Sequence, residues 1–348
     1  MFTNSEKPRK RKTFRSSVVT NKATTDLTEL FEKFVQSKKA AGRSKATISI
    51  YYFHFSVIKR YSEVNDVDLN VKKLDVDDFR DFIIYMLEDH VKFGGHPFKK
   101  EEHMEVGLKP RTANDVLKTL RQIYQFIVRE GVIDKSPLDQ IESVKHTEKP
   151  IDIMTPDEVR NFFASLNLRK YSEFRDYVIA NFLLDSLCRI NETLLLRRHD
   201  FDFEGNFVRI RAEVTKSRIA RIAPFQRRTG KLIQELIAEN ETFNTDFIFL
   251  ANHGEPLKAN HFRNQLRRYA KRMGMRRHFN PHLFRHTGAT WFLEQGGDLR
   301  TLQTILGHAD LRMTMRYTHL TGRSIAASHE QFSPLNNIIG KLNKPRKI

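Results

Sequence analysis

A short stretch near the C-terminal end of the chain carries residues that could hold a phosphate group. It reads Asn280-Pro281-His282-Leu283-Phe284-Arg285-His286-Thr287. Pro281 suits the first position of a helix, because its missing N–H costs nothing there. In a helix that starts at Pro281, His282 and Arg285 lie three residues apart and share one face. A guanidinium and an imidazole on one face favour a bound anion, so this stretch predicts a phosphate site.

Other segments carry residues of similar chemistry. Arg189 follows an apolar stretch, and Glu192 lies three residues after it. Downstream of the His-x-x-Arg stretch, the chain reads Leu306-Gly307-His308 and then reaches Tyr317. In this order, the arginine, the His-x-x-Arg pair, Leu-Gly-His and the tyrosine resemble the tyrosine recombinase (integrase) family. The ordered set is specific, whereas any one of its elements alone is not.

The resemblance implies an enzyme that cuts and rejoins DNA through a tyrosine nucleophile, without metal or ATP. In such a reaction the transition state gathers negative charge on the nonbridging oxygens of the phosphate. Fixed cations aimed at those oxygens lower the barrier, and arginine suits this task because it stays charged and binds two oxygens. An acid must also protonate the leaving 5′-oxygen.

The resemblance implies a role for each residue of the upstream part. Arg189 matches the first catalytic arginine of the family. Glu192 matches its acidic companion, which orients that arginine. Lys216, in the turn Thr215-Lys216-Ser217, matches the lysine of a β-hairpin. In the family this lysine acts as general acid toward the leaving 5′-hydroxyl.

The downstream residues complete the implied site. His282 and Arg285 match the family's His-x-x-Arg pair. His308 matches a second histidine, which often donates a hydrogen bond to the phosphate. Tyr317 matches the nucleophile, which forms a 3′-phosphotyrosyl link to DNA.

Other polar residues have simpler interpretations. We interpret His286 as a structural residue bonded to the backbone, and His278 and His319 as structural or surface residues. Asp200 and Asp202 lie close together but follow a predicted helix end, so we interpret them as surface turn residues. The sequence has neither a carboxylate cluster for divalent ions nor a Gly-x-x-x-x-Gly-Lys loop for ATP. We therefore predict no metal site and no cofactor.

The N-terminal part of the chain predicts a small bundle of helices. Apolar residues at helical spacing begin at Leu27, at Ile48, after the N-cap candidate Asp75, and in the segment Pro110–Glu130. Residues 90–109 lose this pattern and contain two adjacent glycines and a proline, so we predict a loop there.

The C-terminal part predicts further helices around two short strands. Thr155, Pro156 and Glu158 have the spacing of a capping box, so a second domain begins here. Residues Phe207–Ile210 alternate, and a strand near Ile219–Ile222 would pair back with them across the Lys216 turn. Further helices are expected at Val159–Leu166, Tyr177–Leu187, Arg228–Glu239, Lys258–Met273, Pro281–Gln295, Leu299–Leu306 and near Tyr317.

Charge favours a polyanionic partner. The chain of 348 residues has a formal net charge of +18. Double-stranded DNA is the first candidate partner, and a ribosome-associated or simply basic protein is the alternative. Lysines and arginines also line the polar faces of the N-terminal helices. As DNA-contact candidates we select Lys38, Lys39, Arg43, Lys45, Arg111, Lys118 and Arg121, for each of which a solvated surface charge is the alternative.

We predict a mainly α protein with two domains. The segments are a basic tail (1–23), a helical core-binding domain (24–144), a linker (145–154), a catalytic domain with a small antiparallel sheet (155–330) and a C-terminal tail (331–348). The family resemblance is strong over about residues 155–320 and weak over 24–144. It implies a homo-tetramer that acts on two specific DNA sites.

Two alternative functions stay open at this point. One is a type IB topoisomerase, which shares the chemistry but relaxes DNA. The other is a catalytically silent DNA-binding regulator on the same fold. The single cysteine, Cys188, fits a reducing cytosol, and no apolar run approaches the ~20 residues of a membrane span. We therefore expect a cytoplasmic protein.

Overall fold

The structure is a computed structural model. It describes residues 24–92, 104–147, 151–215, 217–275, 277, 279–318, 329–330, 333 and 335. Outside these described residues lie Lys216, His278 and His319, the predicted basic tail 1–23, residues 93–103 of the predicted loop, and most of the predicted tail 331–348. The chain divides into two compact units, Met1–Glu148 and Lys149–Ile348. Among the described helices, none is long and apolar enough to cross a membrane.

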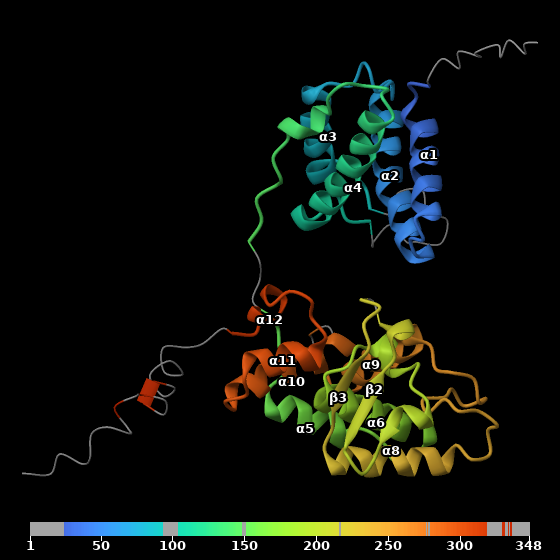
Figure 1. Ribbon diagram of the computed structural model, residues 1–348, viewed down its shortest axis with the longest axis vertical. Helices are drawn as coiled ribbons and strands as arrows, with labels where there is room; N and C mark the ends of the chain where they lie inside the picture. The colour runs from blue at the N-terminus through green and yellow to red at the C-terminus, as the bar shows by residue number, and fades with distance from the viewer. Residues whose placement is uncertain are drawn as a thin grey trace, which may run out of the picture. The chain divides into compact units, whose positions relative to one another are not determined.

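The first unit is a bundle of helices, which Figure 1 shows packed side by side. Its elements are α1 (Leu27–Ala40), α2 (Lys45–Asn65), α3 (Val76–Glu88), α4 (Pro110–Arg129) and the short 3-10 helix η2 (Pro137–Gln140). The four helices predicted from apolar spacing are confirmed.

Local signals begin and end these helices. At the start of α3, the predicted N-cap Asp75 is confirmed, and it forms the reciprocal bonds of a capping box with Asp78. Gly42 and Gly131 follow α1 and α4, and each has a φ of 71°. This left-handed conformation suits glycine and stops a helix.

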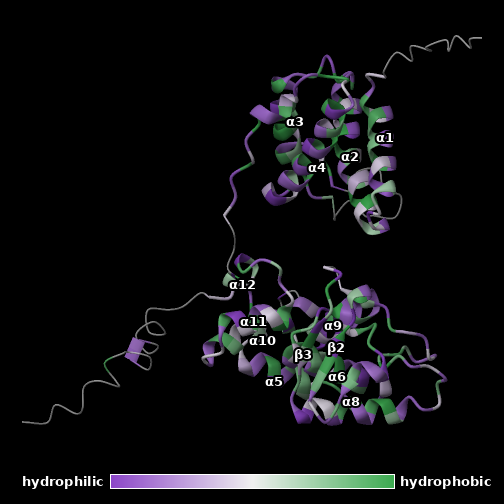
Figure 2. Ribbon diagram, in the orientation of Figure 1, coloured by the Kyte–Doolittle hydropathy of each residue, from purple (hydrophilic) through white to green (hydrophobic). Residues whose placement is uncertain are grey.

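One apolar core holds the bundle together. The colour alternates along α1 and α4 in Figure 2, because each helix carries an apolar face and a polar face. The rings of Phe31 and Phe55 stack with 3.9 Å between centroids. The ring of Tyr124 packs edge-on against Phe79, with 5.3 Å between centroids. Packing of these faces supplies most of the stability that helices of this length need.

The second unit surrounds a small sheet with helices (Figure 1). Its elements are α5 (Pro156–Ala164), α6 (Tyr171–Ser186), α7 (Ile190–Thr193), η3 (Arg198–Asp200), β1 (Phe201–Asp202), β2 (Phe207–Ile210), η4 (Ala212–Val214), β3 (Arg221–Pro224), α8 (Arg227–Glu239), α9 (Ala259–Arg272), α10 (Pro281–Glu294), α11 (Leu299–Leu306) and α12 (Arg312–Met315). The predicted capping box at Thr155 and Glu158 is confirmed.

The sheet has the order β1-β2-β3, and both pairs are antiparallel. The predicted strand that pairs back with Phe207–Ile210 is confirmed, although it spans Arg221–Pro224 and so begins two residues later than expected. The backbone N–H and carbonyl of Ile219 bond to the hydroxyl of Thr215, at 3.1 and 3.2 Å, and so they close the loop. Strand β1, over Phe201–Asp202, was not predicted.

The interpretation of Asp200 as a surface turn residue is also wrong. Its side chain is 2% exposed and forms an ion pair of 3.0 Å with the Nε of Arg211. It also accepts a hydrogen bond from the backbone of Arg197. Asp202, by contrast, accepts from the backbone of Gly205 at 2.7 Å, which is the contact of a turn residue.

Helices α6 and α10 pack closely, and this contact places α10 for the site. A Cβ atom at Gly288 of α10 would lie only 2.2 Å from the carbonyl oxygen of Leu184 in α6. No side chain fits there, so the two backbones meet directly. One turn before Gly288, Phe284 is fully buried against Phe162 and Phe279. These contacts orient Arg285 toward the end of α6.

Candidate active site

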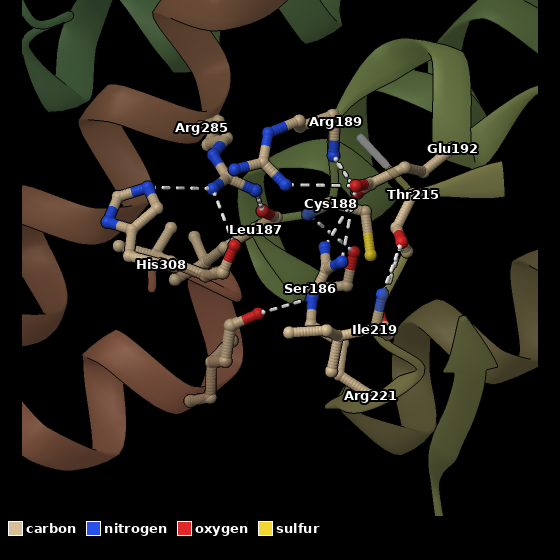
Figure 3. Close-up of polar contacts among 12 residues, drawn as sticks. Ser186, Leu187, Cys188, Arg189, Glu192, Thr215, Ile219, Arg221, Arg285 and His308 are labelled. Atoms are coloured by element: carbon tan, nitrogen blue, oxygen red, sulfur yellow. Dashed lines mark hydrogen bonds and ion pairs between the residues drawn. The ribbon is translucent and has the colours of Figure 1, made fainter. Parts of the chain in front are cut away.

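Arg285 lies where the ends of two helices meet α10 (Figure 3). Its guanidinium donates to the carbonyl of Leu187, which caps α6, and to the carbonyl of Leu306 in α11, at 2.9 Å. Carbonyls at a helix C-terminus are unpaired and carry partial negative charge, so they stabilise a buried cation. Arg285 is 3% exposed, and burial lowers its pKa to about 10, so it stays charged at neutral pH. Within the described part of the chain, no carboxylate forms an ion pair with it.

Arg189 and Glu192 form the next part of the site. Arg189 precedes α7, and its Nη1 lies 2.9 Å from Oε1 of Glu192. The backbone N–H of Arg189 donates to the other carboxylate oxygen at 3.0 Å. The Arg189 side chain keeps 25% exposure, whereas the Glu192 carboxylate is buried. The Glu192 carboxylate therefore contacts both the side chain and the backbone of Arg189.

A second arginine, Arg221 of β3, holds the same carboxylate (Figure 3). Its Nη2 lies 2.6 Å from Oε2 of Glu192, and its Nη1 lies 3.2 Å from Oε1. Burial alone would raise the pKa of Glu192, but hydrogen bonds and charge from Arg221 and Arg189 lower it. Glu192 is therefore an anion at neutral pH, and it balances part of the positive charge of the site.

His308 contacts Arg285 and α12. Its Nε2 lies 3.3 Å from Nη2 of Arg285, and its Nδ1 lies 2.9 Å from the hydroxyl of Thr314. Arginine only donates hydrogen bonds, so Nε2 must accept and Nδ1 carries the proton. Burial and then the charge of Arg285 lower the pKa of His308 to about 4, which agrees with a neutral ring.

Tyr317 contacts His286, and this contact corrects the interpretation of that histidine. The hydroxyl of Tyr317 lies 2.8 Å from Nδ1 of His286, so His286 does not simply bond to the backbone. The tyrosine ring is 6% exposed and packs in a small cluster with Leu302 and Leu306. Burial raises the pKa of Tyr317, so its hydroxyl keeps its proton at neutral pH. Burial, then the neighbouring imidazole of His282 and the charge of Arg285, lower the pKa of His286 to about 4, so it is a neutral acceptor.

His282 lies on the open side of the site, in the first turn of α10. Its ring is 6.2 Å from that of His286, between centroids. Partial burial lowers its pKa, and the charges of Arg285, Arg263 and Arg189 lower it further. At neutral pH the site therefore holds charged arginines beside neutral imidazoles and a protonated tyrosine.

Two family models match this chain. The model of the phage integrase family matches residues 152–323, and the model of the phage integrase SAM-like domain matches residues 26–146. The chain belongs to the phage integrase family of tyrosine recombinases. The resemblance drawn from Arg189, His282, Arg285, His308 and Tyr317 is thereby confirmed at the level of the family.

The similarity of this recombinase to known proteins spans most of its length. The tyrosine recombinase XerD of Listeria innocua is 26% identical over 300 residues, which cover 81% of this chain and 97% of XerD. The tyrosine recombinase XerD of Staphylococcus aureus is 26% identical over 299 residues, which cover 83% and 99%.

The solved structures of one integrase and one recombinase share the fold. The Tn1549 transposon integrase, in complex with a circular intermediate DNA, gives a TM-score of 0.70 at 19% identity and covers 88% of this chain and 100% of that one. The XerH recombinase bound to a palindromic difH substrate gives a TM-score of 0.65 at 21% identity and covers 90% and 86%. The predicted mainly α fold with a small antiparallel sheet is confirmed.

The DNA-contact candidates of this recombinase lie on three helices of the first unit, except Arg43, which lies just before one of them. Lys38 and Lys39 end α1, Arg43 and Lys45 lie at the start of α2, and Arg111, Lys118 and Arg121 lie on α4. Two of them also have partners inside the unit. The Nζ of Lys38 lies 5.0 Å from the ring centroid of Phe34, and Arg121 donates to the carbonyl of Ile141 at 2.7 Å. These two side chains therefore also support the bundle.

The sequence-based set of this recombinase lacked two residues that lie in the site, Arg221 and His286. A signal for Arg221 was available in the alternation of β3, where Arg221 and Ala223 point to the same, inner side. For His286 the signal was helical spacing, since it lies four residues after His282. Among the described residues, no group of three or more His, Cys, Asp or Glu could hold a metal ion.

Proposed function

We propose that this recombinase cuts and rejoins double-stranded DNA at specific sites through a 3′-phosphotyrosyl intermediate on Tyr317. One observation carries the proposal. Arg285 is a buried cation that no described carboxylate neutralises, and it lies with Arg189, His308 and Tyr317 around one location. A phosphodiester is the anion that this arrangement fits, because two arginine forks can bind its two nonbridging oxygens.

The reaction follows from this geometry. The oxygen of Tyr317 attacks phosphorus, and the bond between phosphorus and the 5′-oxygen breaks. His286 is placed to accept the phenolic proton through Nδ1. Arg285 and Arg189 stabilise the charge that grows on the nonbridging oxygens. The new phosphotyrosyl bond conserves the phosphodiester energy, so a 5′-hydroxyl can reverse the step and rejoin DNA.

His308 has to change its proton position to serve as a phosphate donor. In the structure its Nε2 accepts from Arg285. A bound phosphate oxygen would take that arginine proton, and Nε2 would then face the phosphate. Movement of the imidazole proton from Nδ1 to Nε2, with the Thr314 hydroxyl turning to donate to Nδ1, gives the donor that the family role requires.

Lys216 is proposed as the general acid for the leaving 5′-oxygen. The Lys216→Ala variant should cut ordinary DNA about 10²- to 10⁴-fold more slowly, because that oxygen leaves without a proton donor. A 5′-sulfur at the scissile position is a good leaving group without protonation, so this substrate should recover most of the lost rate. The measurement is single-turnover cleavage of both substrates. If the sulfur substrate is slowed as much as the ordinary one, Lys216 is only a phosphate contact.

His286 is proposed to position the nucleophile and accept its proton. The His286→Phe variant keeps a ring of similar size but loses the nitrogen that faces Tyr317, so cleavage should slow by up to about 10²-fold. The matched variant His286→Asn keeps a polar atom near the position of Nδ1 and should retain more of the rate. Single-turnover cleavage, with DNA affinity measured in parallel, tests this. Equal rates for the Phe and Asn variants would contradict the role of His286.

The first unit is proposed to bind DNA through the basic faces of α1, α2 and α4. The support is the position of the seven candidate residues there and the match of this unit to the SAM-like domain of phage integrases. We also propose that four copies assemble on two DNA sites, as the family resemblance implies, to serve a mobile element or a replicon. A cytoplasmic location and the two tails stay predictions.

A recombination assay separates this function from the alternatives. The relatives and solved structures named above are recombinases and integrases, and none of them favours a topoisomerase or a silent regulator. A plasmid that carries two copies of the DNA flanking the gene should be recombined by the purified protein. Relaxation of any supercoiled plasmid without site exchange would favour the topoisomerase. Tight binding of the flanking DNA without strand cutting would favour the regulator.

A further inference from the structure

We propose that Arg221 is a positioning residue that keeps Arg189 available to the phosphate; this inference rests on the proposed function and deepens it. Arg221 lies in strand β3, and its side chain is 8% exposed. It is outside the set of residues that the family resemblance assigns to the reaction. Its contacts link two parts of the site that carry the other arginines (Figure 3).

The first link is to Glu192, whose two carboxylate oxygens each accept two hydrogen bonds. Oε1 receives Nη1 of Arg189 and Nη1 of Arg221, at 2.9 and 3.2 Å. Oε2 receives the backbone N–H of Arg189 and Nη2 of Arg221, at 3.0 and 2.6 Å. A carboxylate offers about four lone-pair positions, and all of them are used here.

The two hydrogen bonds from Arg221 limit how Arg189 can pair with Glu192. Only one of its guanidinium nitrogens, Nη1, bonds to the carboxylate. If Arg221 were absent, two acceptor positions of Glu192 would be free, and Arg189 could turn to bind both oxygens side by side. Paired carboxylate and arginine forks prefer that arrangement. Arg189 would then be neutralised and turned away, so Arg221 keeps the remaining Arg189 donors free for a phosphate.

The second link is to α11. The Nε of Arg221 donates to the carbonyl of Ile305 at 3.0 Å, and the carbonyl of the next residue, Leu306, accepts from Arg285. Gly307 follows with a φ of 63°, and a Cβ there would lie 2.7 Å from Cδ of Arg221. The left-handed conformation favours glycine, and any larger residue there would displace the Arg221 side chain. The Arg221 side chain is thus held in one place against α11 while it holds Glu192.

The experiment uses the full-length protein, single-turnover cleavage of a nicked DNA site, and scissile methylphosphonates. A methylphosphonate replaces one charged nonbridging oxygen by a methyl group, so the arginine that neutralises that oxygen is no longer needed. The Arg221→Met variant removes the charge but keeps an unbranched apolar stem. We expect it to cut ordinary DNA more slowly by on the order of 10²-fold.

The result that tests the proposal is which methylphosphonate restores the cleavage rate of Arg221→Met. The two stereoisomers are tested separately, and Arg189→Ala serves as the reference variant. One stereoisomer should restore the cleavage rate of Arg189→Ala. On that same stereoisomer, the cleavage rate of Arg221→Met relative to wild type should rise at least ten-fold over its value on ordinary DNA, and on the other stereoisomer it should not rise. An equal loss on the phosphate and on both stereoisomers would show a general structural role and overturn the proposal. A normal rate on ordinary DNA would overturn it as well.

Two further variants serve as a control and as a substitute if Arg221→Met does not fold. Arg211→Met removes a comparable arginine from another buried carboxylate, Asp200, and should cut ordinary DNA at nearly the wild-type rate. If Arg221→Met does not fold, Arg221→Lys is used, because lysine keeps the charge but cannot bind both Glu192 oxygens and Ile305 at once. It should show the same stereoisomer pattern with a smaller loss, and a different pattern overturns the proposal. If the wild-type protein itself forms no adduct, the proposed function fails instead.

Discussion

The Tyr317→Phe variant should bind its DNA site with nearly unchanged affinity and form no covalent protein–DNA adduct. The substitution removes the one oxygen that can attack phosphorus. It keeps the ring that packs against Leu302 and Leu306, and it loses the hydrogen bond with His286. Such a bond contributes about 1 kcal/mol to stability, so the variant should remain folded.

A nicked DNA substrate, which traps the adduct after cleavage, provides the measurement. Adducts are separated on a denaturing gel, and binding is followed on a native gel. The matched control is Tyr171→Phe, which removes a hydroxyl that bonds to Asn240 at 2.7 Å, outside the site. This control should form adducts like the wild type. Persistent adducts in the Tyr317→Phe variant would reject Tyr317, and peptide mapping of the adduct would then identify the true nucleophile.

The Arg285→Lys variant should lose cleavage by about 10³- to 10⁵-fold, the range seen when a phosphate-binding arginine is removed from a phosphoryl-transfer site. The guanidinium of Arg285 bonds to Leu187 and Leu306 at the same time as it faces the location of the phosphate. A lysine ammonium keeps the charge but has a single nitrogen, so it cannot reach both carbonyls and a phosphate in one geometry.

Comparison of three measurements tests this expectation. Single-turnover cleavage should fall steeply, while DNA affinity changes little, because the charge is kept. The melting temperature should fall modestly, because one of the two carbonyls loses its donor. The Arg285→Met variant should lose cleavage at least as strongly, since it leaves no cation in the site. A loss smaller than ten-fold in either variant would contradict the central place of Arg285 in the reaction. In that case Arg189 would have to stabilise the transition state alone.

Local signals let the sequence determine the helices and the identity of the family. The capping boxes at Asp75 and Thr155 and the helix start at Pro281 depend only on residues within one turn, so spacing predicts them. Apolar spacing is likewise a property of a single segment. The ordered arginine, His-x-x-Arg, Leu-Gly-His and tyrosine identified the family, because these residue types are rarely needed together except to bind and attack a phosphate.

Only the tertiary structure decided how the site is held. Arg285 bonds to Leu187, which lies 98 residues away, and no local pattern pairs an arginine with a distant backbone carbonyl. The sharing of Glu192 between two arginines, and the contact of Tyr317 with His286, likewise depend on where β3, α7 and α10 meet. Backbone carbonyls and buried carboxylates are present throughout any chain, so their partners follow from packing of whole elements, which residue spacing does not encode.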